Sequence, residues 1–158
     1  MAKRDASVST FVLVHNSVGS GTIDMMGNQE QKDRILPNTI NMDKIASFAL
    51  TEPLNGSDAS GLKTTATRTE GGYLLNGHKR WIGSATFAAY HCVWAKFEGK
   101  VQCFVVDGDA NGLKMHKIEN KYALRLVQNS DFTLENVFVP ERNRLEKAKD
   151  FASGANQI

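Results

Sequence analysis

Short apolar segments separated by turn-forming residues fill the chain from residue 45 onward, and this pattern most limits the folds open to it. Segments 45–50, 79–82, 90–97, 101–106, 113–118 and 129–139 are each expected to form a strand. Gly71-Gly72 and Asn76-Gly77 predict turns, the second a hairpin turn, whereas 64–70 alternates polar residues without a continuous apolar face. A spacing of about ten residues is typical of an antiparallel β-barrel or sandwich.

The first 44 residues carry helix signals instead. Asp5 or Ser7 can cap a helix that runs to about Met26 along a broad apolar face, and Gly27 is expected to end it. We expect His15 to be a hydrogen-bonded residue of this helix; a role beside a substrate is the alternative.

A second helix is expected to begin at Asn28, with Gln31 at the capping-box position. Because Pro37 lacks a backbone N–H, this helix is expected to end near residue 35. The order of signals therefore predicts an α+β fold, in which a short N-terminal helical segment precedes the β-barrel or sandwich. Residues 142–158 are polar without a clear face, and we expect them to fray or to continue into a further element.

The bulk composition excludes several classes of function. The 158 residues suffice for one domain, and with a net charge of +2 and no cluster of Lys and Arg a nucleic-acid site is not expected. No apolar run approaches the roughly 18 residues that span a bilayer. Neither a secretory signal nor a peroxisomal C-terminal address is visible in this chain.

Two groups of residues contain side chains that can bind metals, but we interpret both groups as structural. Cys92 and Cys103 fit no metal or redox spacing and have apolar neighbours, so we expect reduced core residues, with a disulfide between them as the alternative. Residues 107–112 look like the first half of a calcium-binding loop, but Ile118 stands where a bidentate glutamate is required. We expect this stretch to be a polar hairpin loop.

Residues 48–61, FALTEPLNGSDASG, join an apolar strand to a loop of small residues. Such a loop can bring backbone N–H groups close to a ligand because Gly56 and Ser57 carry little bulk, and Thr51 adds a hydroxyl at the strand mouth. Glu52 could act as a base in principle, but we expect it to be a turn-stabilising or surface carboxylate. A surface turn without any ligand is the alternative for the whole stretch.

This stretch resembles the signature of the acyl-CoA dehydrogenase and acyl-CoA oxidase family, which reads small–apolar–Thr–Glu–Pro–x–x–Gly–Ser–Asp. The matching residues are Ala49, Leu50, Thr51, Glu52, Pro53, Gly56, Ser57 and Asp58. A second family strand, Gly–x–Lys–x–Trp–Ile, is matched by Gly77, Lys79, Trp81 and Ile82. The likeness is strongest to the short-chain, plant-type peroxisomal acyl-CoA oxidases, which themselves look like glutaryl-CoA dehydrogenases.

A third stretch, residues 120–140, resembles the family pattern Lys–x–Gly–x–Arg–x–Ser followed by a strand ending Val–x–Val–Pro. The residues that fit are Lys121, Arg125, Val137, Val139 and Pro140. Ala123 and Val127 replace the usual Gly and Ser, which changes the expected turn geometry. We expect Arg125 to be structural and to pair with a carboxylate, with substrate binding as the alternative.

The resemblance implies FAD as cofactor and acyl-CoA as substrate. The residues that it places at the cofactor are Phe48, Leu50, Thr51, Gly56, Ser57, Trp81, Ile82 and Gly83, with Ser57 also the expected acyl-CoA contact. For Trp81 the alternative is a core residue on a strand. Gly83 stands where many dehydrogenases have Thr or Ser beside the flavin, which points mildly toward an oxidase.

The resemblance also implies a mechanism and a domain order. In this family a carboxylate base removes the α proton of acyl-CoA while the β hydride passes to the flavin, giving the trans-2-enoyl-CoA. The base is a Glu of a C-terminal helical domain, expected beyond Ile158, so we expect no catalytic residue in this chain. Residues 1–44 are then expected to end an N-terminal helical domain, 45–141 to form the β-barrel middle domain and 142–158 to be a polar tail. The full-length family implies a homo-oligomer.

Several functional interpretations stay open. The main one is the flavin- and acyl-CoA-binding portion of a peroxisomal acyl-CoA oxidase of fatty acid β-oxidation, incomplete as a catalyst. One alternative is part of an acyl-CoA dehydrogenase similar to the glutaryl-CoA dehydrogenases, for which the mitochondrial matrix is expected. Another is a non-catalytic module that binds CoA or flavin or serves in an assembly. An unrelated β-barrel that matches by accident is the weakest interpretation.

Overall fold

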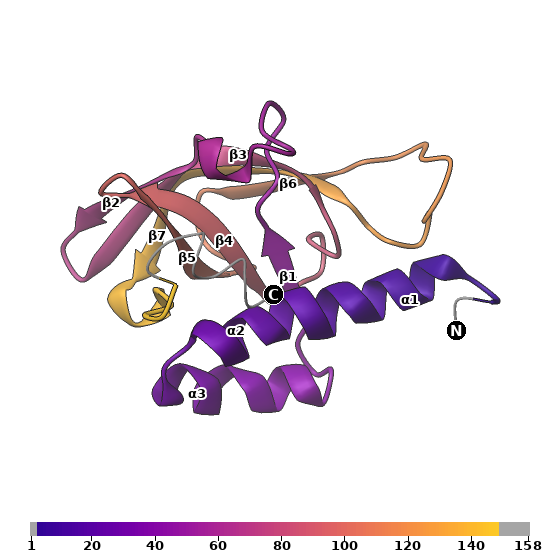
Figure 1. Ribbon diagram of the computed structural model, residues 1–158, viewed down its shortest axis with the longest axis horizontal. Helices are drawn as coiled ribbons and strands as arrows, with labels where there is room; N and C mark the ends of the chain where they lie inside the picture. Colours follow the sequence, from indigo (N-terminus) through magenta and orange to yellow (C-terminus); the bar gives the residue numbers. More distant parts are fainter. Residues whose placement is uncertain (1–2, 149–158) are drawn as a thin grey trace.

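The computed structural model describes residues 3–148, in which a layer of helices packs against a curled β-sheet (Figure 1). The helical elements are α1 (Ala6–Leu13), a π-helical stretch (Val14–Ser20), α2 (Gly21–Met26) and α3 (Gln29–Ile40). The strands are β1 (Ala46–Ala49), β2 (Thr65–Thr69), β3 (Gly72–Ile82), β4 (Tyr90–Phe97), β5 (Lys100–Asp107), β6 (Leu113–Lys117) and β7 (Ser130–Pro140). Short 3-10 turns lie at Ala59–Gly61 and Glu141–Asn143. The predicted α+β class is confirmed.

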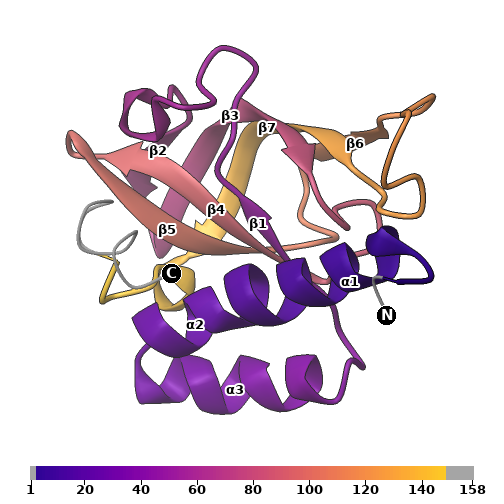
Figure 2. The same cartoon turned by 45° about the vertical axis from the view of Figure 1, so that its right-hand side comes forward.

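The first helix begins and ends where its capping residues predict. The Asp5 carboxylate accepts a hydrogen bond from the Ser7 N–H at 2.7 Å, and the Gly27 N–H closes the last turn on the Ile23 carbonyl at 2.8 Å. Between these caps α1, the π-helical stretch and α2 follow one another directly. Figure 2 shows them as one long rod that lies beneath the sheet, with α3 alongside.

The second helix is capped as predicted but is longer. Asn28 and Gln31 form a complete capping box. The prediction that this helix ends near residue 35 is wrong, because α3 continues through Pro37 to Ile40. Pro37 costs one backbone hydrogen bond, but Ile35 and Thr39 on either side of it are buried. Tertiary packing therefore outweighs the local preference of proline.

His15 joins the helical layer to the sheet. Its Nδ1 accepts a hydrogen bond from the Ala46 N–H at 3.1 Å, so its Nε2 carries the proton and donates to the Thr39 carbonyl at 2.9 Å. Close approach of the two layers is also built in at Gly19, where a Cβ atom would lie 2.8 Å from the Ala46 carbonyl oxygen. The interpretation of His15 as a hydrogen-bonded helix residue is confirmed.

Replacing His15 by leucine tests this joint. Leucine fills a similar volume but leaves the buried Ala46 N–H without its acceptor, at about 1–3 kcal/mol. It also removes one hydrogen bond to the Thr39 carbonyl, worth about 1 kcal/mol, although that carbonyl keeps the Met42 N–H at 3.0 Å. We expect the free energy of unfolding, measured by urea denaturation, to fall by about 2–4 kcal/mol. His116 on β6 is exposed, and a matched His116→Leu variant should stay within about 0.5 kcal/mol of the wild type.

The described residues form a seven-stranded mixed sheet in the order β1-β4-β2-β3-β7-β6, with β5 paired to β4. The pairs β2–β3, β3–β7, β6–β7 and β4–β5 are antiparallel, as expected. Two pairs are parallel, because β1 and β2 both lie along β4: Ala46 to Ala49 pair with Tyr90 to Val93, and Thr65 pairs with Lys96. The order of strands along the chain does not predict these two parallel contacts.

The hairpin turn predicted at Asn76-Gly77 is wrong, because β3 runs straight through both residues. Gly77 serves close packing, since a Cβ there would lie 2.3 Å from the Thr64 Oγ1. Asn76 donates from Nδ2 to the Asn136 Oδ1 across β7 at 3.0 Å, beside a shift in strand register. The turn lies at Gly71, with a φ of +73°, and the polar segment before it forms β2.

Two apolar clusters form the core of the described chain. One fills the inside of the curled sheet and includes Tyr73, Phe104 and Phe132. The other lies between the sheet and the helices and includes Ile23 and Trp94. The second cluster also contains Cys92 and Cys103, whose thiols are free and buried, so the prediction of reduced core cysteines is confirmed.

The segment after β7 packs against the helical layer. Gln31 donates from Nε2 to the carbonyls of Arg142 and Arg144 at 2.8 and 2.7 Å, and Leu145 and Ala148 are buried. The expected fraying of the polar tail therefore does not apply to residues 142–148. The rest of that predicted tail, 149–158, lies outside the described residues.

Candidate functional site

The two motif-bearing strand ends lie side by side. The Arg80 N–H, near the end of β3, donates to the carbonyl of Thr51, just after β1, at 2.9 Å. In Figure 1 the chain leaving β1 rises next to β3 before it enters the loop that follows. Residues that are about 30 positions apart in the sequence are thus brought to one edge of the sheet, as the two motifs predict. The role of each residue there stays a prediction.

Trp81 is displayed at this edge rather than buried. Its side chain is 51 % exposed, and its φ of +63° lies in the left-handed region, which costs an L-residue about 1–2 kcal/mol. Asn129 donates from Nδ2 to the Trp81 carbonyl at 3.0 Å, and the Arg80 guanidinium lies 5.7 Å from the centre of the indole ring. A core role for Trp81 is excluded, and its exposed indole face offers a stacking surface for a planar ligand.

A change of register at the end of β3 accounts for this exposure. From Tyr73 to Lys79 every second side chain is directed to the inside of the sheet, and continued alternation would bury Trp81. The register with β7 shifts between Lys79 and Ile82, so that Ile82 instead enters the core, with 2 % exposure. Ile82 can therefore contribute only backbone groups to a ligand at this edge.

Gly83 lies beneath the edge, between the first helix and the loop before β7. A Cβ atom there would lie 3.5 Å from Val14 and 3.7 Å from Val127, which is ordinary contact. The following residue, Ser84, is 1 % exposed with a φ of +61°, and its hydroxyl has no hydrogen-bond partner among the described residues. Sequence reasoning did not single out Ser84, because a serine in a turn carries no signal of burial.

The predicted residues on β1 and directly after it differ in which way their side chains face. Phe48 and Leu50 are half-buried and pack on the cluster that faces the helices, where Phe48 meets Trp94 edge-on with 6.0 Å between ring centres. Thr51 is half-buried where β1 ends. The side chains of Phe48 and Leu50 thus support the strand from below, and Thr51 is the member of this set that stands beside the Trp81 segment.

The small-residue loop projects from the same edge. Gly56 and Ser57 are exposed, and a Cβ at Gly56 would meet no atom within 4 Å. The loop is closed at its base by paired backbone hydrogen bonds between Glu52 and Asn55, both 3.2 Å, and farther on by Asp58, which accepts from the Gly61 N–H at 3.0 Å. An open, ordered loop of this kind leaves backbone groups accessible to a ligand.

Glu52 and Lys79 form a buried ion pair that the sequence did not reveal. The Lys79 Nζ lies 2.9 Å from the Glu52 Oε1, and their side chains are 0 % and 4 % exposed. Glu52 also accepts hydrogen bonds from the Lys63 N–H and from the N–H and hydroxyl of Thr64. The prediction of a turn-stabilising carboxylate is confirmed, whereas a surface position for it is wrong. The signal available beforehand was Lys79 at an inward position of the strand alternation.

The burial and hydrogen bonds of Glu52 and Lys79 shift the pKa values of both groups. Burial favours the neutral carboxylic acid, but the hydrogen bonds from Thr64, Lys63 and Lys79 outweigh it, so the pKa of the Glu52 carboxyl falls from 4.5 to about 2. Burial lowers the pKa of Lys79 from 10.5 to about 8, although the hydrogen bond and the charge of Glu52 act the other way. Glu52 is therefore ionised, fully paired and unsuited to the role of a catalytic base at neutral pH.

The pKa of Glu52 predicts a loss of stability in acid. A pKa of about 2 in the folded chain against 4.5 unfolded stabilises the fold above pH 4.5, and this contribution disappears as pH falls toward 2. The difference corresponds to about 3 kcal/mol. In Glu52→Gln the contribution is absent, so the gap in unfolding free energy between the wild type and this variant should shrink from pH 5 to pH 2, as followed by urea denaturation. A gap that does not change with pH would contradict the assignment.

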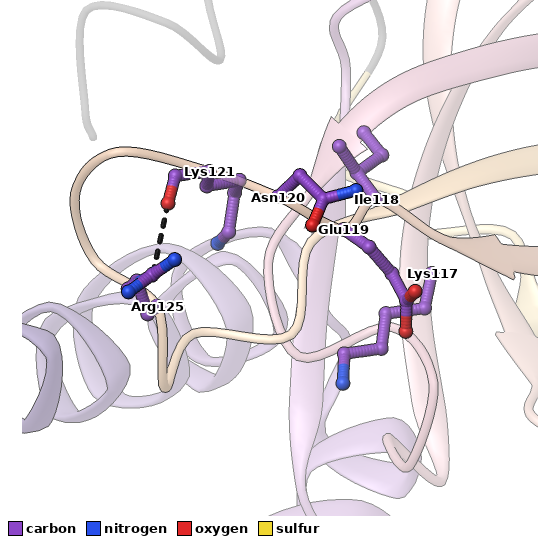
Figure 3. Close-up of a pocket in the computed structure, with 6 residues that line it drawn as sticks. All are labelled: Lys117, Ile118, Glu119, Asn120, Lys121 and Arg125. Atoms are coloured by element: carbon purple, nitrogen blue, oxygen red, sulfur yellow. Dashed lines mark hydrogen bonds between the residues drawn. The ribbon is translucent and has the colours of Figure 1, made fainter.

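The loop between β6 and β7 borders two cavities. One, of about 500 Å³, is lined by Trp81, Asn129 and residues 118–124. The other, of about 260 Å³, is drawn in Figure 3 and is lined by residues 117–121 and Arg125. Tyr122 is fully exposed on the same loop. The larger cavity is therefore the hollow that adjoins the exposed indole of Trp81.

Lys121 and Arg125 hold this loop together. The Lys121 ammonium donates to the carbonyls of Leu124 and Val127 and to the Asn129 side chain. Arg125 donates from Nε to the Lys121 carbonyl at 3.0 Å (Figure 3). Within residues 3–148 no ion pair joins Arg125 to a carboxylate, so its predicted partner is wrong and its structural role is local.

The chain matches two models of known protein families. The model of the acyl-CoA dehydrogenase middle domain matches residues 47–137, more than half of the chain, and that of the acyl-CoA dehydrogenase N-terminal domain matches residues 1–43. The chain belongs to the acyl-CoA dehydrogenase family. The stretches that carry the Thr51 and Trp81 motifs both lie inside the middle-domain match.

Individual proteins that are similar to this chain belong to the same family. An acyl-CoA dehydrogenase of Bacillus subtilis is 37 % identical over 95 % of this chain and 41 % of its own length. The mitochondrial short/branched chain specific acyl-CoA dehydrogenase of Rattus norvegicus is 36 % identical over 93 % of this chain and 35 % of its own length. A Mycobacterium smegmatis glutaryl-CoA dehydrogenase in complex with FADH2 superimposes with a TM-score of 0.89 at 34 % identity, over 94 % of this chain and 39 % of that one.

The chain corresponds to only part of each of these relatives. The chain spans about two fifths of the length of the B. subtilis protein and about a third of that of the rat protein. All three of these relatives are dehydrogenases, which favours the dehydrogenase alternative over the oxidase interpretation. Among the described residues, no helix is long and apolar enough to cross a membrane.

Proposed function

We propose that this chain is the cofactor-binding part of an FAD-dependent acyl-CoA dehydrogenase similar to the glutaryl-CoA dehydrogenases. One observation carries the proposal: the Thr51 segment is hydrogen-bonded beside an exposed, backbone-strained Trp81. In the proposed division, residues 1–44 end an N-terminal helical domain, 45–141 form the middle domain and 142–158 are a polar tail.

The residues at this edge fit a flavin. A planar aromatic ring can stack on the indole of Trp81, which the protein holds outward against the strand alternation. Backbone groups of Leu50, Thr51 and Trp81 to Gly83 would hold the ring, and the open loop at Gly56 would face the phosphates. When bound, FAD supplies the acceptor for a hydride equivalent.

Acyl-CoA is the proposed substrate, and Ser57 is its proposed contact. Ser57 is exposed on a loop whose small side chains leave room for a long, flexible ligand. No catalytic residue is assigned among residues 3–148, since Glu52 is buried and committed to Lys79. A homo-oligomer of the full-length protein belongs to the same proposal, as does a mitochondrial location, which the rat relative has by name.

An acyl-CoA oxidase, with a peroxisomal location, is the second candidate. Gly83 favours it, because a residue without a hydroxyl stands buried at the end of the Trp81 segment. The two candidates differ in how fast a reduced flavin in this site reacts with dioxygen. Chemically reduced, FAD-loaded chain that reoxidises within seconds in air-saturated buffer would favour the oxidase, and reoxidation over many minutes would favour the dehydrogenase.

Binding of FAD is the direct test of the main proposal. We expect the purified chain to be yellow, or to become so with added FAD, with a flavin absorption band that shifts when an acyl-CoA is added. The added FAD should also quench the fluorescence of the exposed Trp81 more than that of the buried Trp94. A chain that folds but leaves the fluorescence and the absorption of added FAD unchanged would contradict the proposal.

A further inference from the structure

We propose that Lys79 and Glu52 are positioning residues, which hold the Thr51 segment and its loop in register with Trp81; this inference rests on the proposed function for its link to FAD. The pair lies directly behind the candidate site. Lys79 belongs to β3 two residues before Trp81, and Glu52 follows Thr51 directly. The two halves of the site are therefore joined by one buried ion pair.

Lys79 holds the near end of the loop. Its Nζ donates to the carbonyl of Leu50 at 3.1 Å and to the Glu52 Oε1 at 2.9 Å, so it contacts the chain on both sides of Thr51. The Arg80 N–H then bonds to the carbonyl of Thr51 itself. Three consecutive residues after β1 are thereby fixed by two consecutive residues of β3.

Glu52 holds the far end of the same loop. Its Oε2 accepts from the Lys63 N–H at 2.6 Å and its Oε1 from the Thr64 N–H at 2.9 Å. Thr64 in turn lies against Gly77 of β3, where a Cβ atom would be too close. One carboxylate therefore closes a loop that leaves at residue 50 and returns at residue 64, and it anchors both ends to β3.

A buried ion pair is an uncertain source of stability, because an apolar pair of similar volume often gives an equally stable fold. Its replacement can therefore separate folding from positioning. A Leu and Met pair can fill the space of Glu52 and Lys79 but offers no donor to the Leu50 carbonyl and no acceptor to Lys63 and Thr64. The loop should then lose its register with β3 while the two cores, which contain neither residue, stay intact.

The experiment uses the full chain with the double substitution Glu52→Leu and Lys79→Met. The Arg80 N–H is hydrogen-bonded to the Thr51 carbonyl, so its rate of amide hydrogen exchange reports whether the Thr51 segment keeps its register with β3. The Cys92 and Val93 amides of β4 serve as the internal reference. We expect exchange at Arg80 to accelerate at least about tenfold relative to the reference, and FAD to bind about tenfold more weakly. The matched control removes the exposed Lys114–Glu135 pair by Lys114→Met and Glu135→Leu and should change neither readout.

The possible results distinguish a failure of the positioning role from a failure of the proposed function. Unchanged protection at Arg80 in the folded double variant, or unchanged FAD affinity, would overturn the positioning role and leave the pair as a structural element only. If the wild type itself binds no FAD while Arg80 loosens in the variant, the positioning stands and the proposed function fails. Should the double variant not fold, Thr64→Val removes only one hydroxyl donor to Glu52 and should still accelerate Arg80 exchange severalfold; unchanged exchange there would also overturn the proposal.

Discussion

Replacing Lys79 alone by methionine is expected to lower the free energy of unfolding by about 3–5 kcal/mol. Methionine fills the space of the lysine stem, but it leaves the Glu52 carboxylate buried without its counter-ion and the Leu50 carbonyl without its donor. The Lys79 side chain is fully buried, so solvent cannot replace the lost contacts. Urea denaturation at pH 7 measures the loss.

The matched control for this result is Lys114→Met, in an ion pair whose two side chains are both 57 % exposed. Exposed pairs contribute at most about 1 kcal/mol, so this variant should unfold close to the wild type. Equal effects of the two substitutions would contradict the view that burial makes the Lys79 pair costly to break. Adding Glu52→Leu to Lys79→Met should recover part of the stability, because the unpaired charge is then removed as well, whereas the Lys63 and Thr64 N–H groups lose their acceptor.

Replacing Trp81 by glycine is expected to weaken FAD binding by about 10- to 100-fold while lowering the free energy of unfolding by no more than about 2 kcal/mol. About half of the indole surface is already exposed, so the folded chain loses only the contacts of the buried half. Glycine also accepts the left-handed backbone at this position without strain, which offsets its entropy cost. Isothermal titration with FAD and urea denaturation give the two quantities.

Phe138 offers a control for the loss of an exposed aromatic ring. It is 47 % exposed and pairs with Leu74, toward the other end of β3 from Trp81. Phe138→Ala should leave the affinity for FAD unchanged. If Trp81→Gly retains full affinity, the cofactor does not stack on this indole, and the proposed site has to be moved.

Local chemistry in the sequence predicted much of the architecture. Capping residues predicted the start and end of the first helix and the start of the second, because a cap is an interaction between neighbours in the chain. Short apolar segments bounded by turn-forming residues predicted β4 at its observed bounds, and β5, β6 and β7 to within one residue at each end. The errors at Pro37 and Asn76-Gly77 arose where packing against distant residues outweighed a local preference.

The sequence by itself determined the family, the caps and most strands, since these depend on residue type and short-range spacing. Only the tertiary structure decided that Trp81 faces outward, because a register shift against β7 reverses the expected alternation. It also decided that Glu52 and Lys79 are buried together, although 27 positions separate them in the chain. Burial and charge pairing are properties of the folded surroundings, and a strand pattern alone does not state which distant side chain will occupy the same space.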